Sequence, residues 1–181
     1  MLYYDGEYHQ YYLWNPDLRG WGRCWAHAVS DDLVHWRHQP IAIPEHPKLG
    51  RCCSGTAVVD WNNTSGFQTG KEKVLVAFPT NFNGTHQVIS LAYSNDRGRT
   101  WAYYDKSPIL DIQHRHFRDA KVFRCKIRRA LIALFSLWGF KHLLKVTLYP
   151  LTMTIEYGLE TLPVFKAHTI GKTKLSCLIL R

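Results

Sequence analysis

The sequence lacks the features that mark several protein classes. Its longest apolar run, residues 131–140, has ten residues, whereas a membrane-spanning helix needs about 20. No heptad repeat is sustained, and the glycine, proline and aromatic content is wrong for a coiled coil. The first residues, MLYYDGEYH, have neither the basic nor the apolar region of a signal peptide. We therefore expect no membrane partner, and no localisation follows from the sequence.

Cysteine spacing gives no metal or disulfide framework. The five cysteines, at 24, 52, 53, 125 and 177, are odd in number and include no C-x-x-C pair. The adjacent Cys52 and Cys53 are poorly spaced for a disulfide or a metal. A structural or incidental role is expected for these thiols.

Acidic residues are scarce in the last third of the chain. Residues 1–123 hold 13 Lys and Arg against 12 Asp and Glu, a net charge of +1, whereas residues 124–181 hold ten against two, a net of +8. Six of the seven tryptophans precede residue 124. The basic residues of the tail are dispersed, without a cluster or a nucleic-acid motif, so a polyanion-binding appendage is the less favoured interpretation and no nucleic-acid partner is expected.

Turn signals separate short runs rich in Val, Ile, Tyr and Trp. Asp5-Gly6, between two aromatic runs, predicts a two-residue hairpin. No helical periodicity is visible before residue 124, and the apolar run 131–140 is expected to form a short buried or interfacial helix. The pattern predicts an all-β fold, as a sandwich, barrel or propeller. Further strands are expected at residues 25–30, 40–43, 55–60, 73–78, 88–94, 100–104 and 120–124.

An internal near-repeat favours the propeller. Two segments align with each other: AHAVSDDLVHW (26–36) and SLAYSNDRGRTW (90–101). Their serines, Ser30 and Ser94, are 64 residues apart, which is a plausible length for a propeller blade. The second copy looks like an Asp-box, S-x-D-x-G-x-T-W, a propeller turn in which Ser and Asp side chains bond the backbone. Its expected role is structural. A third copy would fall near residue 158, where TIEYGLETLPVF has neither S-x-D nor Trp.

Five ordered motifs together resemble glycoside hydrolase family 32, the invertase, levanase and inulinase group. They are YYDGEYHQYYLWNP (3–16), WAHAVSDDLVHWRHQPIAI (25–43), CSGTAVVDWNNTSGF (53–67), SLAYSNDRGRTW (90–101) and FRDAKVF (117–123). The resemblance implies a five-bladed β-propeller with a central pocket, of which this chain holds an incomplete fragment of about two to three blades. It also implies retaining hydrolysis of β-fructosides such as sucrose, levan or inulin, with no metal and no cofactor.

The resemblance further implies which residues form the sugar site. Asp119 of the Arg118-Asp119 pair is expected to bind fructose hydroxyls and stabilise the oxocarbenium-like transition state, and Arg118 keeps it ionised. Some matched positions depart from the family pattern: Leu13 stands where a substrate-binding Gln is usual, and Ala120 where Pro is usual. Cys53 likewise replaces Phe. The implied substrate-binding residues are Asn15, Trp21, Cys53, Ser54, Arg118 and Asp119.

Both catalytic carboxyl groups of the family are missing from the sequence. Retaining glycosidases need two carboxyl groups about 5–5.5 Å apart. The family's nucleophile lies in a W-M-N-D-P-N motif and its acid/base in a Glu-Cys pair, and neither motif occurs here. We therefore expect a glycosidase by family with little or no turnover. A non-catalytic fructan-binding propeller and a remnant without function are the alternatives, and the oligomeric state stays open.

The resemblance ends at residue 124, where charge and tryptophan usage also change. We interpret residues 1–123 as a partial propeller catalytic region and residues 124–181 as a divergent basic tail. A shifted reading frame or a substituted segment is one hypothesis for this change, and genuine divergence of the tail is the alternative. If the frame is shifted, the coding nucleic acid read in another frame after codon 123 restores blade-like sequence with a Glu-Cys motif.

Overall fold

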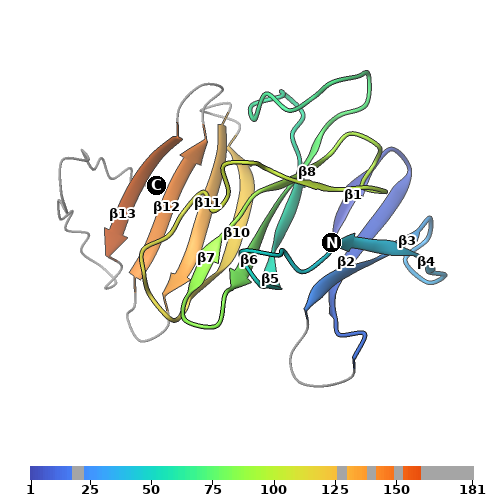
Figure 1. Cartoon of the computed structure of the whole chain (residues 1–181). Helices are drawn as coiled ribbons and strands as arrows, with labels where there is room; N and C mark the ends of the chain where they lie inside the picture. The colour runs from blue at the N-terminus through green and yellow to red at the C-terminus, as the bar shows by residue number, and fades with distance from the viewer. Residues whose placement is uncertain (18–22, 126–129, 138–141, 149–152, 160–181) are drawn as a thin grey trace.

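Three antiparallel β-sheets make up the described part of the molecule. The computed structural model describes residues 1–17, 23–125, 130–137, 142–148 and 153–159, with side chains as far as Val122. All regular elements in these ranges are strands, which confirms the all-β prediction. The sheets follow one another across the molecule in chain order, from blue through green to orange (Figure 1).

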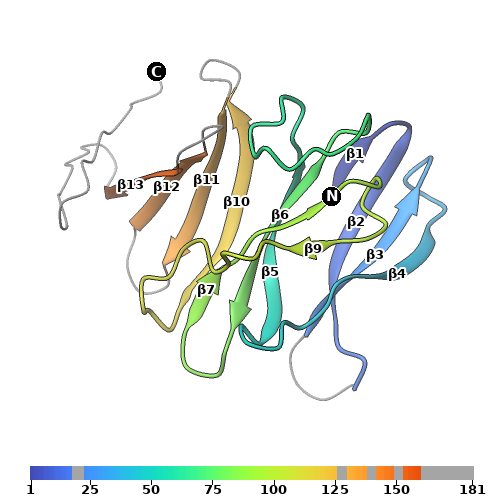
Figure 2. The same ribbon diagram turned by 45° about the horizontal axis from the view of Figure 1, so that its top comes forward.

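Each sheet is a meander of neighbouring strands. The first has the order β1 (Leu2–Tyr4), β2 (Glu7–Trp14), β3 (Cys24–Ser30), β4 (Arg37–Ile43). The second has the order β5 (Arg51–Val59), β6 (Leu75–Phe82), β8 (Ala92–Ser94), β9 (Ala102–Tyr103), and β7 (Gln87–Ile89) also pairs with β6. The third has the order β10 (Phe117–Cys125), β11 (Ala130–Leu137), β12 (His142–Leu148), β13 (Met153–Leu159). Figure 2 shows β10 of the third sheet next to the second sheet.

The predicted Asp5-Gly6 hairpin is confirmed. Tyr4 pairs with Glu7 across the turn, and Asp5 and Gly6 have φ values of 49° and 88°. Positive φ at both central residues is what a type I′ turn requires. The predicted strands before residue 125 also form, with 88–94 divided between β7 and β8.

The helix expected at residues 131–140 is wrong. Residues up to Leu137 form β11, which pairs with β10 on one side and β12 on the other; residues 138–140 lie outside the described residues. A short apolar run fits a buried strand as well as a helix, and here pairing on both edges satisfies its backbone. β10 itself runs through residue 123, the boundary expected from composition, and the divergence of the tail stays a prediction.

Both copies of the repeat form the expected turn. In the second, Ser94 donates to Asp96 Oδ1 at 2.7 Å, and Asp96 accepts the Thr100 amide at 2.9 Å. The Trp101 indole donates to the Gly98 carbonyl at 3.1 Å. The first copy repeats these contacts around Asp32, where Leu33 takes the left-handed conformation with φ 68°.

The second Asp-box turn also joins two sheets. Arg97 Nη2 lies 2.6 Å from Asp5 Oδ2, and Arg99 Nη2 lies 2.6 Å from Glu7 Oε2. The Trp101 ring packs edge-on against Tyr11 of β2, with centroids 5.5 Å apart. A turn predicted from local chemistry thus also fixes the first sheet against the second.

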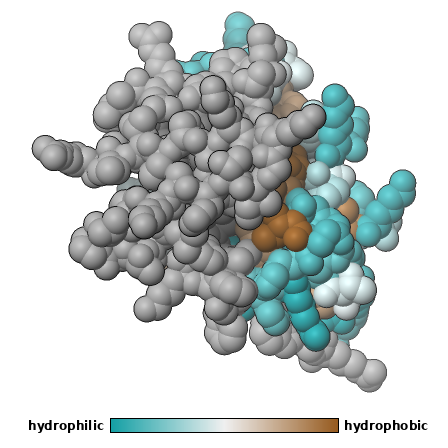
Figure 3. All heavy atoms as spheres, turned by 90° about the vertical axis from the view of Figure 1, so that its left-hand side faces the viewer, coloured by the Kyte–Doolittle hydropathy of each residue, from teal (hydrophilic) through white to brown (hydrophobic). Residues whose placement is uncertain are grey.

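Buried side chains fill the spaces between neighbouring sheets. Trp25, Ile43, Cys52 and Ala77 pack between the first and second sheets. Between the second and third, the buried cluster includes Val76, Phe78, Ile89, Phe117 and Val122. On the face in Figure 3, hydrophobic side chains of the described residues form a limited patch among hydrophilic ones.

Cys24, Cys52 and Cys53 are free thiols. Among the described residues, no group of three or more His, Cys, Asp and Glu side chains is placed to hold a metal ion. That part of the chain also holds no helix with the length and apolarity needed to cross a membrane.

Candidate functional site

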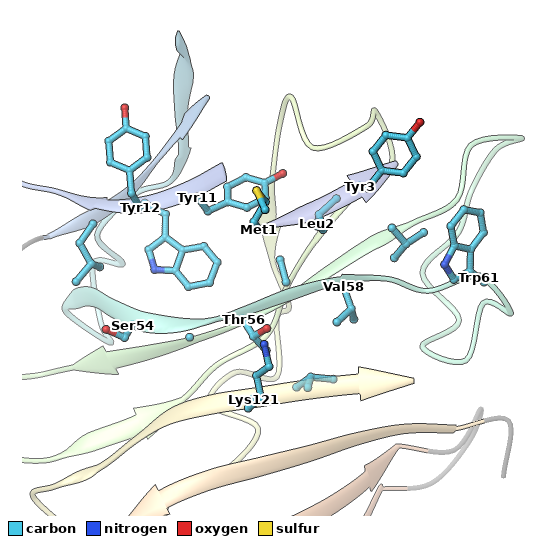
Figure 4. Close-up of a pocket in the computed structure, with 16 residues that line it drawn as sticks. Met1, Leu2, Tyr3, Tyr11, Tyr12, Ser54, Thr56, Val58, Trp61 and Lys121 are labelled. Carbon is cyan, nitrogen blue, oxygen red and sulfur yellow. The ribbon is translucent and has the colours of Figure 1, made fainter. Parts of the chain in front are cut away.

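A cavity of about 690 Å³ lies between the first strands of the three sheets. Residues 54–59 of β5 line it along their length (Figure 4). Residues 1–3 border it from the first sheet, and Lys121 and Val122 from β10. In Figure 4, Ser54 lies at one end and Trp61 at the other. Three strands distant in sequence therefore face one space.

The lining combines aromatic rings with a few polar groups. Its rings come from Tyr3, Tyr11, Tyr12, Trp25 and Trp61. Ser54 and Thr56 add hydroxyl groups, and Lys121 adds an ammonium group. Aromatic faces stack on sugar rings while hydroxyls and charges bind sugar hydroxyls, so this lining suits a carbohydrate.

Two first strands carry a β-bulge next to this cavity. On β5, Cys52 pairs with Asn81 and Gly55 with Pro79, so Cys53 and Ser54 together oppose one residue of β6. On β10, Arg118 pairs with Ser136 and Lys121 with Leu134, so Asp119 and Ala120 likewise oppose one residue of β11. Bulges bend a strand and re-aim its side chains. Both bulges contain residues that the sequence assigned to the sugar site.

Asp119 is held in an unusual backbone conformation. Its φ is 62°, in the left-handed region that Asp tolerates better than most residues. Its amide donates to Thr80 Oγ1 at 3.1 Å. The carboxylate Oδ2 lies 3.5 Å from Arg118 Nε, and 46% of the side chain is exposed. The carboxylate is therefore paired with a cation and still open to hydroxyl donors.

Arg118 is anchored from a third strand. Its Nη1 donates to Gln87 Oε1 at 3.4 Å, and its side chain is only 24% exposed. The guanidinium can thus counter the Asp119 charge from this position.

Cys53 lies within electrostatic range of the same pair. Burial is the largest effect and raises the pKa of its thiol. The Asp119 carboxylate also raises this pKa, whereas the Arg51 and Arg118 cations lower it. The thiol is therefore protonated at neutral pH and acts as a weak donor rather than as a nucleophile. The structure thus brings Cys53, Arg118 and Asp119 together, and Ser54, next in the chain, lies on the cavity wall.

Two residues near this site were absent from the predicted set. Trp25 of β3 is 4% exposed, and its indole donates to the Cys53 carbonyl at 2.6 Å. It fixes the β5 bulge from the first sheet. Lys121 lies on the cavity wall. Both lie inside the motifs WAHAV and FRDAKVF, but their roles depend on contacts that spacing alone does not reveal.

Of the predicted residues that the structure describes, only Ser54 lines the cavity. Asn15 follows β2, and its Oδ1 accepts the Asp17 amide at 3.2 Å in a local turn; it is not in the cavity lining. Trp21 lies outside the described residues. Leu13 lines the cavity and is 44% exposed. Among the described residues, the lining includes no Asp or Glu, so the carboxyl pair that retaining hydrolysis needs is not found there.

Successive antiparallel meanders that turn their first strands toward one cavity are the blades of a β-propeller. They define a propeller protein, and its aromatic and hydroxyl-bearing lining is of a kind that suits a carbohydrate.

The family follows from comparison with known proteins. Residues 1–160 match the model of the glycosyl hydrolases family 32 N-terminal domain, and the chain belongs to this family. A levanase of Bacillus subtilis (strain 168) is 54% identical over 125 residues, covering 68% of this chain and 18% of the levanase. A levanase of Bacillus sp. (strain L7) is 38% identical over 175 residues, covering 87% of this chain and 18% of that protein.

Solved structures agree with this assignment. The fructofuranosidase of Schwanniomyces occidentalis complexed with fructose gives a TM-score of 0.76 at 32% identity, with 83% of this chain and 31% of that chain covered. The exo-inulinase of Aspergillus awamori gives 0.76 at 30% identity, with 85% and 35% covered. The predicted family and propeller fold are confirmed, and the chain spans about a fifth of the levanases and a third of these solved chains.

Proposed function

We propose that this chain forms the fructoside-binding part of a retaining β-fructosidase and that alone it binds β-fructosides with little or no turnover. The carrying observation is the pair of bulges on β5 and β10: they contain Cys53, Ser54 and Asp119, and Cys53 lies within electrostatic range of Asp119 and Arg118. Homologues named levanase and invertase, and a solved relative complexed with fructose, support sucrose and fructans as the ligand class.

In this proposal Asp119 accepts hydrogen bonds from fructose hydroxyls. Its negative charge favours the oxocarbenium-like transition state that forms at the fructosyl unit. The Arg118 guanidinium counters this charge, with its Nε atom 3.5 Å from Asp119 Oδ2. The Ser54 hydroxyl contributes a further hydrogen bond from the cavity wall. Bond cleavage needs two further carboxyl groups, a nucleophile and an acid/base, and the described cavity lining contains neither.

The second candidate function is a fructan-binding propeller, whose role is binding itself and not a share in a hydrolase. The observation that favours it is the cavity itself, which has five aromatic side chains and no carboxylate among its described lining residues. Such a lining suits retention of a sugar rather than attack on it.

Calorimetry with the purified chain tests the proposal. We expect binding of fructose, sucrose and inulin, and at least about tenfold weaker binding in Asp119→Asn, since a hydrogen bond to a charged group contributes about 1.5–3 kcal/mol. Asp31→Asn is the control, because Asp31 pairs with Arg37 in an exposed turn. A folded chain that binds none of these sugars would overturn the proposal and favour a remnant without function. Fructose release above a buffer blank, lost in Asp119→Ala, would contradict the expected lack of turnover.

A further inference from the structure

Thr80 contacts the candidate site from the neighbouring sheet. It lies on β6 and pairs with Ile89 of β7. Its side chain is fully buried, yet its hydroxyl oxygen accepts the Asp119 amide at 3.1 Å. Thr80 belongs to the second sheet and Asp119 to the third, so this bond crosses between two blades.

The bulge explains why this bond matters. Asp119 and Ala120 fall between the paired positions of β10 and β11, so the regular ladder has no register partner for Asp119. A backbone amide that has no partner in the ladder bonds to another acceptor, either a side chain or water. Thr80 supplies it at a residue whose left-handed φ of 62° persists only when its surroundings hold it there.

From this geometry we propose that Thr80 is a positioning residue: through the Asp119 amide it fixes the backbone conformation that presents the Asp119 carboxylate to a fructoside. The binding part of this inference rests on the proposed function. The conformational part is independent of it, because it concerns the ligand-free protein.

Thr80→Val is the main test, since it keeps the side-chain shape and removes the acceptor. Thr80→Ser restores the hydroxyl, and Thr80→Ala is a second deletion if the valine variant does not fold. Ser90→Ala is a matched control: Ser90 is also fully buried, but its hydroxyl has no partner among the described residues. Two quantities are measured in the full chain by NMR, the exchange rate of the Asp119 amide and the side-chain ¹³C shift of Asp119. Fructose affinity is measured by calorimetry.

We expect Thr80→Val to speed Asp119 amide exchange and to weaken fructose binding, each by about tenfold, which corresponds to the loss of one hydrogen bond. Thr80→Ser and Ser90→Ala should match the wild type. An unchanged exchange rate in Thr80→Val would overturn the inference, and so would unchanged affinity despite faster exchange. If the wild type binds no fructoside, the proposed function fails. In that case the Asp119 ¹³C chemical shift tests the conformational part of the inference alone. A chemical shift that changes in Thr80→Val and has its wild-type value in Thr80→Ser supports positioning by Thr80. An unchanged chemical shift in Thr80→Val refutes it.

Discussion

The Nδ1 atom of His9 and the Nε2 atom of His27 lie 3.1 Å apart on β2 and β3, with both side chains fully buried. The two rings stack with centroids 5.3 Å apart, and Tyr11 stacks on His27 at 4.5 Å. Burial lowers the pKa of His27 to about 3; a proton on His9 and the Arg99 cation act in the same direction. Burial also lowers the pKa of His9, against the raising effect of the Glu7 carboxylate. Both histidines are therefore neutral in the folded protein at neutral pH.

This pair predicts a loss of stability in acid. In the unfolded chain both histidines take up a proton near pH ~6.5, so unfolding consumes protons below that pH. The stability that the two neutral histidines contribute should be fully present above pH ~6.5 and should fall as the pH drops toward about 3. For each histidine, the unfolding equilibrium constant should rise by up to about tenfold for each pH unit. Urea midpoints at about pH 7.5, 5.5 and 4.5 measure this slope. His27→Gln should flatten it, whereas His35→Gln, with a side chain 86% exposed, should not. Equal slopes in the wild type and His27→Gln would refute the assignment.

One added methyl group at Gly98 should destabilise the protein strongly. A Cβ at this position would lie 2.3 Å from the Tyr11 hydroxyl oxygen and 3.0 Å from Leu75 Cδ1. Gly98→Ala should lower the free energy of unfolding by about 2–4 kcal/mol, from left-handed strain and overpacking together. Gly66 has the same φ of 76° with nothing within 4 Å, so Gly66→Ala should lose only about 1–2 kcal/mol. Denaturant titration compares them; similar losses would show that the Tyr11 contact is unimportant.

Substitution of Asp96 tests how much the second Asp-box contributes to the stability of the protein. Its carboxylate accepts bonds from Ser94, from the Arg99 amide, and from both the amide and the hydroxyl of Thr100. Asp96→Ala should lower the free energy of unfolding by about 2 kcal/mol, because several charge-assisted bonds are lost at once. Asp31→Ala removes an exposed ion pair with Arg37 and should cost under about 1 kcal/mol. If thermal or urea unfolding showed equal losses, the turn network would not be the source of stability.

Trp25 predicts an effect on binding across two sheets. Trp25→Phe keeps an aromatic ring in the core but removes the 2.6 Å bond to the Cys53 carbonyl. Because that bond fixes the β5 bulge, we expect fructose to bind about tenfold more weakly, as for the loss of one hydrogen bond. Trp36→Phe removes a comparable bond to Leu33 in an exposed turn and should leave the affinity unchanged. Calorimetry measures the fructose affinity of both variants. Equal affinities would show that the Trp25 bond to the β5 bulge does not affect fructose binding.

Local chemistry made some features predictable. The Asp5-Gly6 hairpin and the Asp96 turn each depend on side chains within a few residues, so their residue types were sufficient. The strand at residues 131–137 was not predictable, because its conformation depends on pairing with β10 and β12 and short apolar runs carry no decisive period.

The site was predictable only in part. Asp119, Arg118, Cys53 and Ser54 could be placed from motif resemblance, but the bulges that orient them result from register between strands. Pro79 shows the same limit: a proline usually interrupts a central strand, yet here it lies within β6 opposite Gly55, at the edge of the β5 bulge.

The meander order of the sheets has a consequence for synthesis of the chain. Every strand pairs with strands close to it in sequence, so the first sheet has all its partners once residue 43 has left the ribosome and the second once residue 103 has. Each sheet can therefore form during translation, before the next is made. When β10 emerges, the surface that receives Asp119 already exists, so the candidate site is the last feature of this region to be assembled.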